Sequence, residues 1–181
     1  MSQAPAPRTA VERATAFFLR PSIGEPTRAT FLVRLATGCV FVCSGLIKFL
    51  YDNQGPGRFA RIGLPDPSAL AYFVGAVEVL CGALILAGLA ARLAAVPLVI
   101  DMLVAIATTK LPLLFGAGPE PVAAMPRTGF WAFAYQARLD FTMLTGCIFV
   151  VVSGAGLWSL DALLSRRDPA RLGAPGHSAR R

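Results

Sequence analysis

Apolar residues dominate four long stretches of the chain, at about residues 29–50, 69–91, 93–115 and 137–158. A helix needs about 20 mostly apolar residues to cross the hydrocarbon core of a bilayer. Backbone groups in lipid must be satisfied within the spanning segment, which favours helices over open strands. The pattern therefore predicts an all-α membrane protein, a four-helix transmembrane bundle over residues 29–165.

The polar segments between these stretches predict the connections. "GLAARLAAVP" is short enough to form a tight hairpin between the second and third spans, and it carries Arg92. "GRFARIGLP", in the longer loop 51–68, predicts a short helix at the membrane interface. The Gly/Pro-rich "GAGPEPVAAMPRTG" is followed by the aromatic cluster "FWAFAY", which is typical of the head-group level.

Basic residues predict the orientation, because arginine and lysine are enriched in cytoplasmic loops. They gather in the two tails, 1–28 and 166–181, and in the hairpin: Arg8, Arg13, Arg20, Arg28, Arg92, Arg166, Arg167, Arg171, Arg180 and Arg181. We expect both tails and the hairpin in the cytoplasm, and the loops holding Arg58 and Arg127 outside. The apolar segment "ATAFFL" is too short for a signal-peptide core, so the first span should act as an uncleaved signal in the plasma (inner) membrane.

Several charged residues lie within the predicted spans: Arg34, Lys48, Glu78, Asp101, Lys110, Arg138 and Asp140. Insertion scales put the cost of such a charge at the helix centre at about 2.5–3.5 kcal/mol, so each is a functional candidate by default. At about 100° per residue, five of them fall on helix stripes made mostly of small or polar residues: Arg34, Lys48, Glu78, Asp101 and Asp140. Small residues let membrane helices approach closely, so these stripes should face the bundle interior.

Depth sorts the charges into two groups. Arg34 and Asp101 both lie in the half nearer the cytoplasm, and we expect them to form a buried ion pair. The outer half holds the candidates for ligand binding or proton transfer: Lys48, Glu78, Lys110, Arg138 and Asp140. Glu78 is the deepest of these, with Lys48 its first expected partner and Arg138 the second. The competing interpretation is that paired charges only hold the helices in register.

Composition excludes some other classes of site. Hydrophobic residues make up 55% of the 181 residues and charged residues 15%, and the net charge of +7 lies largely in the tails, which favours anionic lipid over nucleic acid. The single histidine, His177, is remote from the four cysteines, so a zinc or haem site is not expected. The cysteines lie in apolar stretches, where packing is their usual role, although Cys147 shares a face with Asp140: they are Cys39, Cys43, Cys81 and Cys147.

Three segments together resemble the DoxX-like integral membrane family. They are "RLATGCVFVCSGLIKF", "GLPDPSALAYFVGAVEVLCGALILAGLAARLAA" and "RLDFTMLTGCIFVVVSGAGLWSLDALL". The resemblance implies a four-helix bundle and matches the family's motif at Arg34, Lys48, Glu78 and Asp140. It also implies a role in redox metabolism, because namesake members take part in quinone-linked oxidation of reduced sulfur compounds or in membrane assemblies against oxidative stress.

The expected function is an accessory membrane subunit of a quinone-linked oxidoreductase or redox-stress complex. Membrane lipid, redox proteins and further copies of the chain are the expected partners. No cofactor is readable from the sequence, and quinone is the one the resemblance implies. Two alternatives remain: a small carrier or permeation scaffold that uses a Glu78/Lys48 pocket, and a non-catalytic assembly factor.

Overall fold

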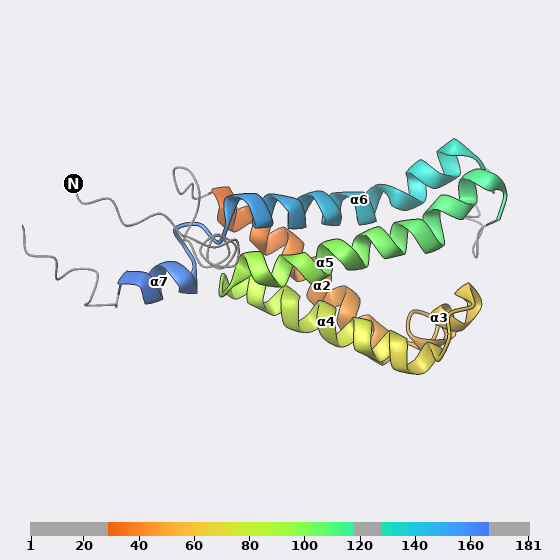
Figure 1. Ribbon diagram of the computed structural model, residues 1–181, viewed down its shortest axis with the longest axis horizontal. Coiled ribbons are helices and arrows are strands. Elements are labelled where there is room, and N and C mark those ends of the chain that lie inside the picture. Colours follow the sequence, from red (N-terminus) through yellow and green to blue (C-terminus); the bar gives the residue numbers. More distant parts are fainter. Residues whose placement is uncertain (1–28, 118–127, 167–181) are drawn as a thin grey trace, which may run out of the picture.

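The computed structural model describes residues 29–117 and 128–166, and every regular element within them is helical. Four helical segments are long and apolar enough to cross a membrane: α2 (Ala29–Leu50), α4 (Pro67–Ala87), Ala91–Phe115, which begins with α5 (Ala91–Ala105), and α6 (Phe130–Ser153). They run side by side along the long axis (Figure 1). This confirms the predicted all-α class with four spans. The expectations for the tails and for Arg127 fall outside the described residues.

A capping side chain and a glycine turn set the starts of two of the spans, α4 and α6. The side chain of Asp66 caps α4 by accepting a hydrogen bond from the backbone N–H of Ala69 at 3.4 Å. The last span begins at Phe130 rather than near residue 137, so the aromatic cluster forms the first turns of α6 instead of preceding it. Gly129, with φ of 99°, supplies the backbone turn that starts this helix early.

Three further features place the ends of the bundle. The expected interfacial helix is α3 (Pro56–Ile62), which joins α2 to α4. The turn between α4 and α5 is only Gly88–Ala90, and α7 (Leu160–Arg166) follows α6. In Figure 1 the start of α2, this turn and α7 lie at one end of the bundle, and α3 lies at the other. We call these the hairpin end and the α3 end.

Glycines set the close contact between α2 and α4. A Cβ atom on Gly38 would lie 2.9 Å from the carbonyl oxygen of Gly82, and one on Gly45 would lie 2.6 Å from that of Gly75. Both pairs belong to the stripes that also carry Arg34 and Glu78, and these stripes are buried as predicted. The absence of side chains at the crossing allows the two backbones to touch, which is how membrane helices gain packing energy.

Arg34 binds backbone carbonyls at the hairpin end. Its guanidinium donates to Ile85 at 2.9 Å and Leu86 at 2.7 Å, in the last turn of α4, and to Ala155 at 2.6 Å and Trp158 at 2.9 Å, after α6. The side chain is 1% exposed. Five N–H donors in a fixed planar arrangement suit arginine to this task.

The predicted Arg34–Asp101 pair is therefore wrong. Arg34 lies five residues after the start of α2 at Ala29, whereas Asp101 lies ten residues after the start of α5 at Ala91. Side chains on a helix point toward its N-terminus, so Arg34 reaches back to the hairpin end and away from Asp101. The carbonyls that accept its hydrogen bonds lie in the last turn of α4 and in the segment after α6, where the α-helical hydrogen-bond pattern ends.

Arg92 is a second buried arginine at the same end. It lies in the first turn of α5 rather than in the exposed hairpin, and it donates to the carbonyl of Val152 near the end of α6 at 3.3 Å. Asp161 of α7 accepts a hydrogen bond from the backbone N–H of Ala90 at 3.0 Å, and Ala90 itself has a φ of 46°. The hairpin end is thus joined by hydrogen bonds between side chains and backbone that involve five helices, α2, α4, α5, α6 and α7.

Gly45→Leu should separate α2 from α4 and destabilise the bundle. The added side chain meets the Gly75 carbonyl and, at 2.7 Å, a methyl group of Val79. Overpacking of this kind costs about 1–3 kcal/mol. Thermal unfolding of the purified protein in mild detergent measures the loss. Cys43→Leu is the matched control on the same helix, because Cys43 is exposed and should tolerate the change. Equal melting temperatures for the two variants would contradict the close crossing.

Candidate functional site

The site begins with an ion pair between Lys48 of α2 and Glu78 of α4. The Glu78 side chain is 2% exposed and that of Lys48 is 16% exposed. Lys48 lies near the C-terminal end of α2, and its side chain points back toward the middle of the helix. The structure therefore brings together the first partner expected for Glu78, and it does so at a depth away from either end of the bundle.

Asp101 of α5 joins this pair. Its carboxylate lies within electrostatic reach of both Glu78 and Lys48. Glu78 precedes the end of α4 at Ala87 by nine residues, and Asp101 follows the start of α5 at Ala91 by ten, so the tight turn between the helices brings both to one level. Counting residues from the hairpin in this way would have found the contact in the sequence.

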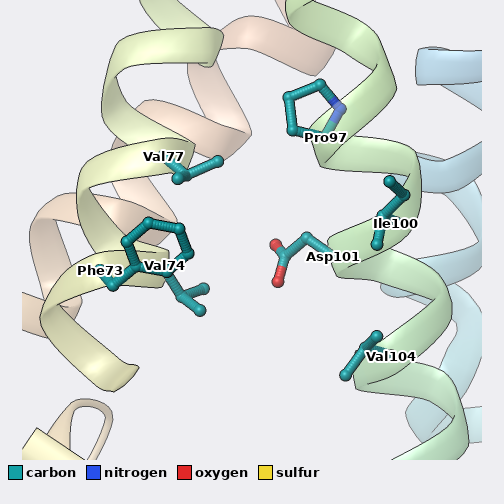
Figure 2. A pocket seen from close by; sticks show the side chains of 7 residues that line it. All are labelled: Phe73, Val74, Val77, Pro97, Ile100, Asp101 and Val104. Carbon is teal, nitrogen blue, oxygen red and sulfur yellow. The ribbon is translucent and has the colours of Figure 1, made fainter. Parts of the chain in front are cut away.

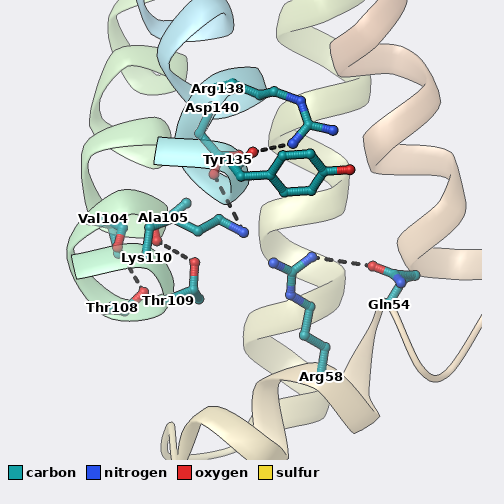
Figure 3. Close-up of polar contacts among 10 residues, drawn as sticks. All are labelled: Gln54, Arg58, Val104, Ala105, Thr108, Thr109, Lys110, Tyr135, Arg138 and Asp140. Carbon is teal, nitrogen blue, oxygen red and sulfur yellow. Dashed lines mark hydrogen bonds and ion pairs between the residues drawn. The ribbon is translucent and has the colours of Figure 1, made fainter. Parts of the chain in front are cut away.

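A second ion pair connects the last two spans. Lys110 lies 3.6 Å from the carboxylate of Asp140 on α6 (Figure 3), and Asp140 is also within electrostatic reach of Asp101. Five residues from four spans thus form a continuous group, which we call the central cluster: Lys48, Glu78, Asp101, Lys110 and Asp140.

A π-helical turn positions Lys110. In an uninterrupted α-helix Lys110 would lie on the face opposite Asp101, because nine residues at about 100° each amount to two and a half turns. The segment Ile106–Lys110 is instead π-helical, and a π turn holds more residues than an α turn, which rotates Lys110 toward the bundle. Thr109 bonds the carbonyl of Ala105 at 2.6 Å within this turn (Figure 3). Sequence periodicity gives no sign of such a turn.

Arg138 lies outside the central cluster. Its guanidinium lies over the ring of Tyr135, 3.7 Å from the ring centroid, and donates a hydrogen bond to the Tyr135 carbonyl (Figure 3). The residue is exposed. Of the candidates read from the sequence, the structure therefore unites Lys48, Glu78, Lys110 and Asp140, adds Asp101, and leaves Arg138 with its own helix.

The charges of the central cluster do not balance. It holds three carboxylates, on Glu78, Asp101 and Asp140, and two ammonium groups, on Lys48 and Lys110. One buried oxygen of Asp101, Oδ2, has no hydrogen-bond partner within the described residues. A buried charge without a partner is unfavourable, so the cluster is suited to take up one further proton or hydrogen-bond donor.

A groove between α4 and α5 ends at this cluster. It has a volume of about 260 Å³, and Asp101 is the only charged residue that lines it (Figure 2). The other lining residues are apolar: Phe73, Val74, Val77, Pro97, Ile100 and Val104. The groove was not anticipated from the sequence, because it depends on how the two helices diverge beyond their turn.

The cysteines take no part in the ion pairs. Cys147 is buried in the apolar core, Cys81 is half-buried, Cys39 and Cys43 are exposed on α2, and all four are free thiols. Within residues 29–117 and 128–166, no group of three or more His, Cys, Asp or Glu side chains has an arrangement suited to a metal ion.

Because Lys48 has two acidic neighbours, removing one acid and removing the base should have unequal effects on stability. Glu78→Gln leaves Asp101 as a counter-ion to Lys48, so the variant should keep most of its stability. Lys48→Met leaves two adjacent carboxylates without a base and should cost about 3–5 kcal/mol, the usual cost of breaking a buried pair. Melting temperatures in detergent test this.

The double variant provides the control for that comparison. Combining Lys48→Met with Glu78→Gln removes one charge of each sign and should recover most of the lost stability. Equal losses from the two single changes would contradict a role for Asp101 as the second counter-ion.

Comparison with known proteins agrees with the architecture. The sequence profile of the DoxX family matches residues 29–111. A relative named "Uncharacterized membrane protein Rv3486", from Mycobacterium tuberculosis, is 49% identical over 147 residues, which cover 81% of this chain and 87% of the relative. A second, "Putative oxidoreductase CatD" from Bacillus subtilis, is 30% identical over 132 residues, 73% of this chain and 84% of the relative. No solved structure matches the chain.

Proposed function

The chain belongs to the DoxX family of membrane proteins, and from this we propose that it is an accessory membrane subunit of a quinone-linked oxidoreductase or membrane redox-stress complex. The observation that carries the proposal is the central cluster, a set of acids and bases buried within a bundle of apolar helices. The name of the Bacillus subtilis relative, an oxidoreductase, supports the reaction class.

The charge count favours chemistry over simple pairing. Helix register alone needs one base for each acid, whereas among the described residues the central cluster holds one carboxylate beyond its lysines. Quinone reduction consumes two electrons and two protons, and its reversal releases them. In this proposal Glu78 and Asp101 exchange the protons and Lys48 donates a hydrogen bond to a quinone oxygen. The electrons come from, or go to, a partner dehydrogenase.

The apolar lining of the groove favours this proposal over a small carrier for a water-soluble solute. A small carrier for a water-soluble solute would also use Glu78 and Lys48, but it needs a polar route to them. The walls of the groove are apolar and include Phe73, which is 66% exposed on the outer face of the bundle. The groove reaches the central cluster at Asp101 and suits a molecule dissolved in the bilayer, which favours quinone. A non-catalytic assembly factor would need neither the extra carboxylate nor the groove.

Co-purification tests the proposed role. The tagged chain, extracted from its native membrane in mild detergent, should bring down a dehydrogenase subunit and quinone in the lipid extract. Glu78→Gln is the matched control: it should retain the protein partner and the quinone and lose quinone-dependent electron transfer, because position 78 no longer exchanges a proton. A preparation with neither quinone nor a protein partner would contradict the proposal.

The arginine distribution carries a second proposal, that the protein lies in the plasma membrane with both termini in the cytoplasm. Arg58→Cys and Arg127→Cys should then react with a membrane-impermeant thiol reagent on intact cells. Leu89→Cys in the turn between α4 and α5 should react only after lysis. The reverse pattern of labelling would overturn this orientation.

A further inference from the structure

The groove between α4 and α5 connects the outer surface of the bundle with a carboxylate in its interior. Its rim is made of side chains exposed on the outside of the bundle, including Phe73 of α4 and Ile100 and Val104 of α5. Its floor is the carboxylate of Asp101, which Figure 2 shows pointing from α5 toward α4, near Val74 and Val77. A molecule dissolved in the bilayer can therefore reach a buried acid without crossing the bundle.

The polar residue that lines the groove, Asp101, needs a hydrogen-bond donor from the ligand. Oδ2 of Asp101 is buried and has no partner within the described residues, and a carboxylate oxygen accepts hydrogen bonds. The charged neighbours of Asp101 are Lys48, Glu78 and Asp140, and all three approach it from the bundle interior rather than from the lining of the groove. A carbonyl group would leave Oδ2 unsatisfied, whereas a hydroxyl group would satisfy it.

The volume limits the size of the occupant. At about 260 Å³ the groove lies just below the roughly 300–1,000 Å³ of pockets that enclose drug-sized ligands. It therefore suits one substituted ring, with any longer tail remaining between the lipid chains. The apolar walls match the faces of such a ring, and Asp101 matches a hydroxyl group at its end.

We propose that the α4/α5 groove binds a lipid-dissolved phenolic molecule, whose apolar body lies between the two helices and whose hydroxyl group donates a hydrogen bond to Asp101. This inference rests on the proposed function, because it identifies the hydroxyl-bearing, reduced form of a quinone-type substrate as the form the groove recognises. It also assigns the contact with this hydroxyl-bearing form to Asp101, whose carboxylate lies within electrostatic reach of Glu78 and Lys48.

Two probes isolate the hydroxyl group. The purified chain in nanodiscs is incubated with tritiated 4-hexylphenol, and bound ligand is measured by scintillation proximity. Unlabelled 4-hexylphenol and its methyl ether, 4-hexylanisole, then compete for the site. The ether retains the apolar body and lacks the donor, so it should compete at least about tenfold more weakly, as expected for loss of a hydrogen bond to a charged group.

Two neighbouring positions on α5 give matched variants. Val104→Trp places an indole ring in the groove and should abolish saturable binding. Leu103→Trp should leave binding unchanged, because Leu103 is equally exposed, at 52% against 51% for Val104, but does not line the groove. Asp101→Asn should weaken the phenol at least about tenfold and leave the ether unaffected.

The outcomes separate this inference from the proposed function. Equal competition by phenol and ether, or equal binding by the two tryptophan variants, would show a groove that takes any apolar chain and would overturn the inference. The measurement needs no protein partner, so failure to co-purify a dehydrogenase would leave this result standing. If 4-hexylphenol shows no saturable binding while a dehydrogenase still co-purifies, the inference about the groove is overturned and the proposed function is not.

Discussion

The absence of water from the hydrocarbon core is the constraint on which the arrangement of this bundle depends. Each charged side chain inside it needs a partner from another helix, because solvent is not there to supply one. Arg34 finds four backbone carbonyls, Lys48 finds Glu78, and Lys110 finds Asp140. These contacts join α2 to α4 and the third span to α6, so satisfying the charges also fixes which helices are neighbours.

Close backbone contact makes the first of these ion pairs attainable. Glycines at positions 38 and 45 lie against glycines at 82 and 75, so α2 and α4 approach without intervening side chains. The stem of Lys48 then needs to cover only a short distance to reach Glu78. A bulkier crossing would separate the charges, and a buried carboxylate without its base is strongly unfavourable. Packing and electrostatics therefore depend on each other at this interface.

The buried charges form two groups, one at the hairpin end and one in the middle of the bundle. At the hairpin end, Arg34 and Arg92 donate to backbone carbonyls in the last turns of α4 and α6, where the α-helical hydrogen-bond pattern ends. In the middle, the central cluster consists of side chains alone, holds one carboxylate more than its bases require, and borders a groove open to the lipid-facing side. The arginines join the ends of the helices, whereas Asp101 of the central cluster lines the groove.

The sequence by itself determined the class of the protein, the four spans and the inward stripes of α2 and α4, since these depend on apolar length and helical periodicity. It also identified Lys48 and Glu78 as partners, because their side chains share a depth that the direction of each helix fixes. Only the tertiary structure decided the partners of Arg34 and Asp101, the inward position of Lys110 and the groove. Those depend on side-chain reach, on a π turn that interrupts the periodicity and on the divergence of two helices beyond their turn. A regular helical wheel contains none of this information, because it assumes straight helices and does not record how they cross.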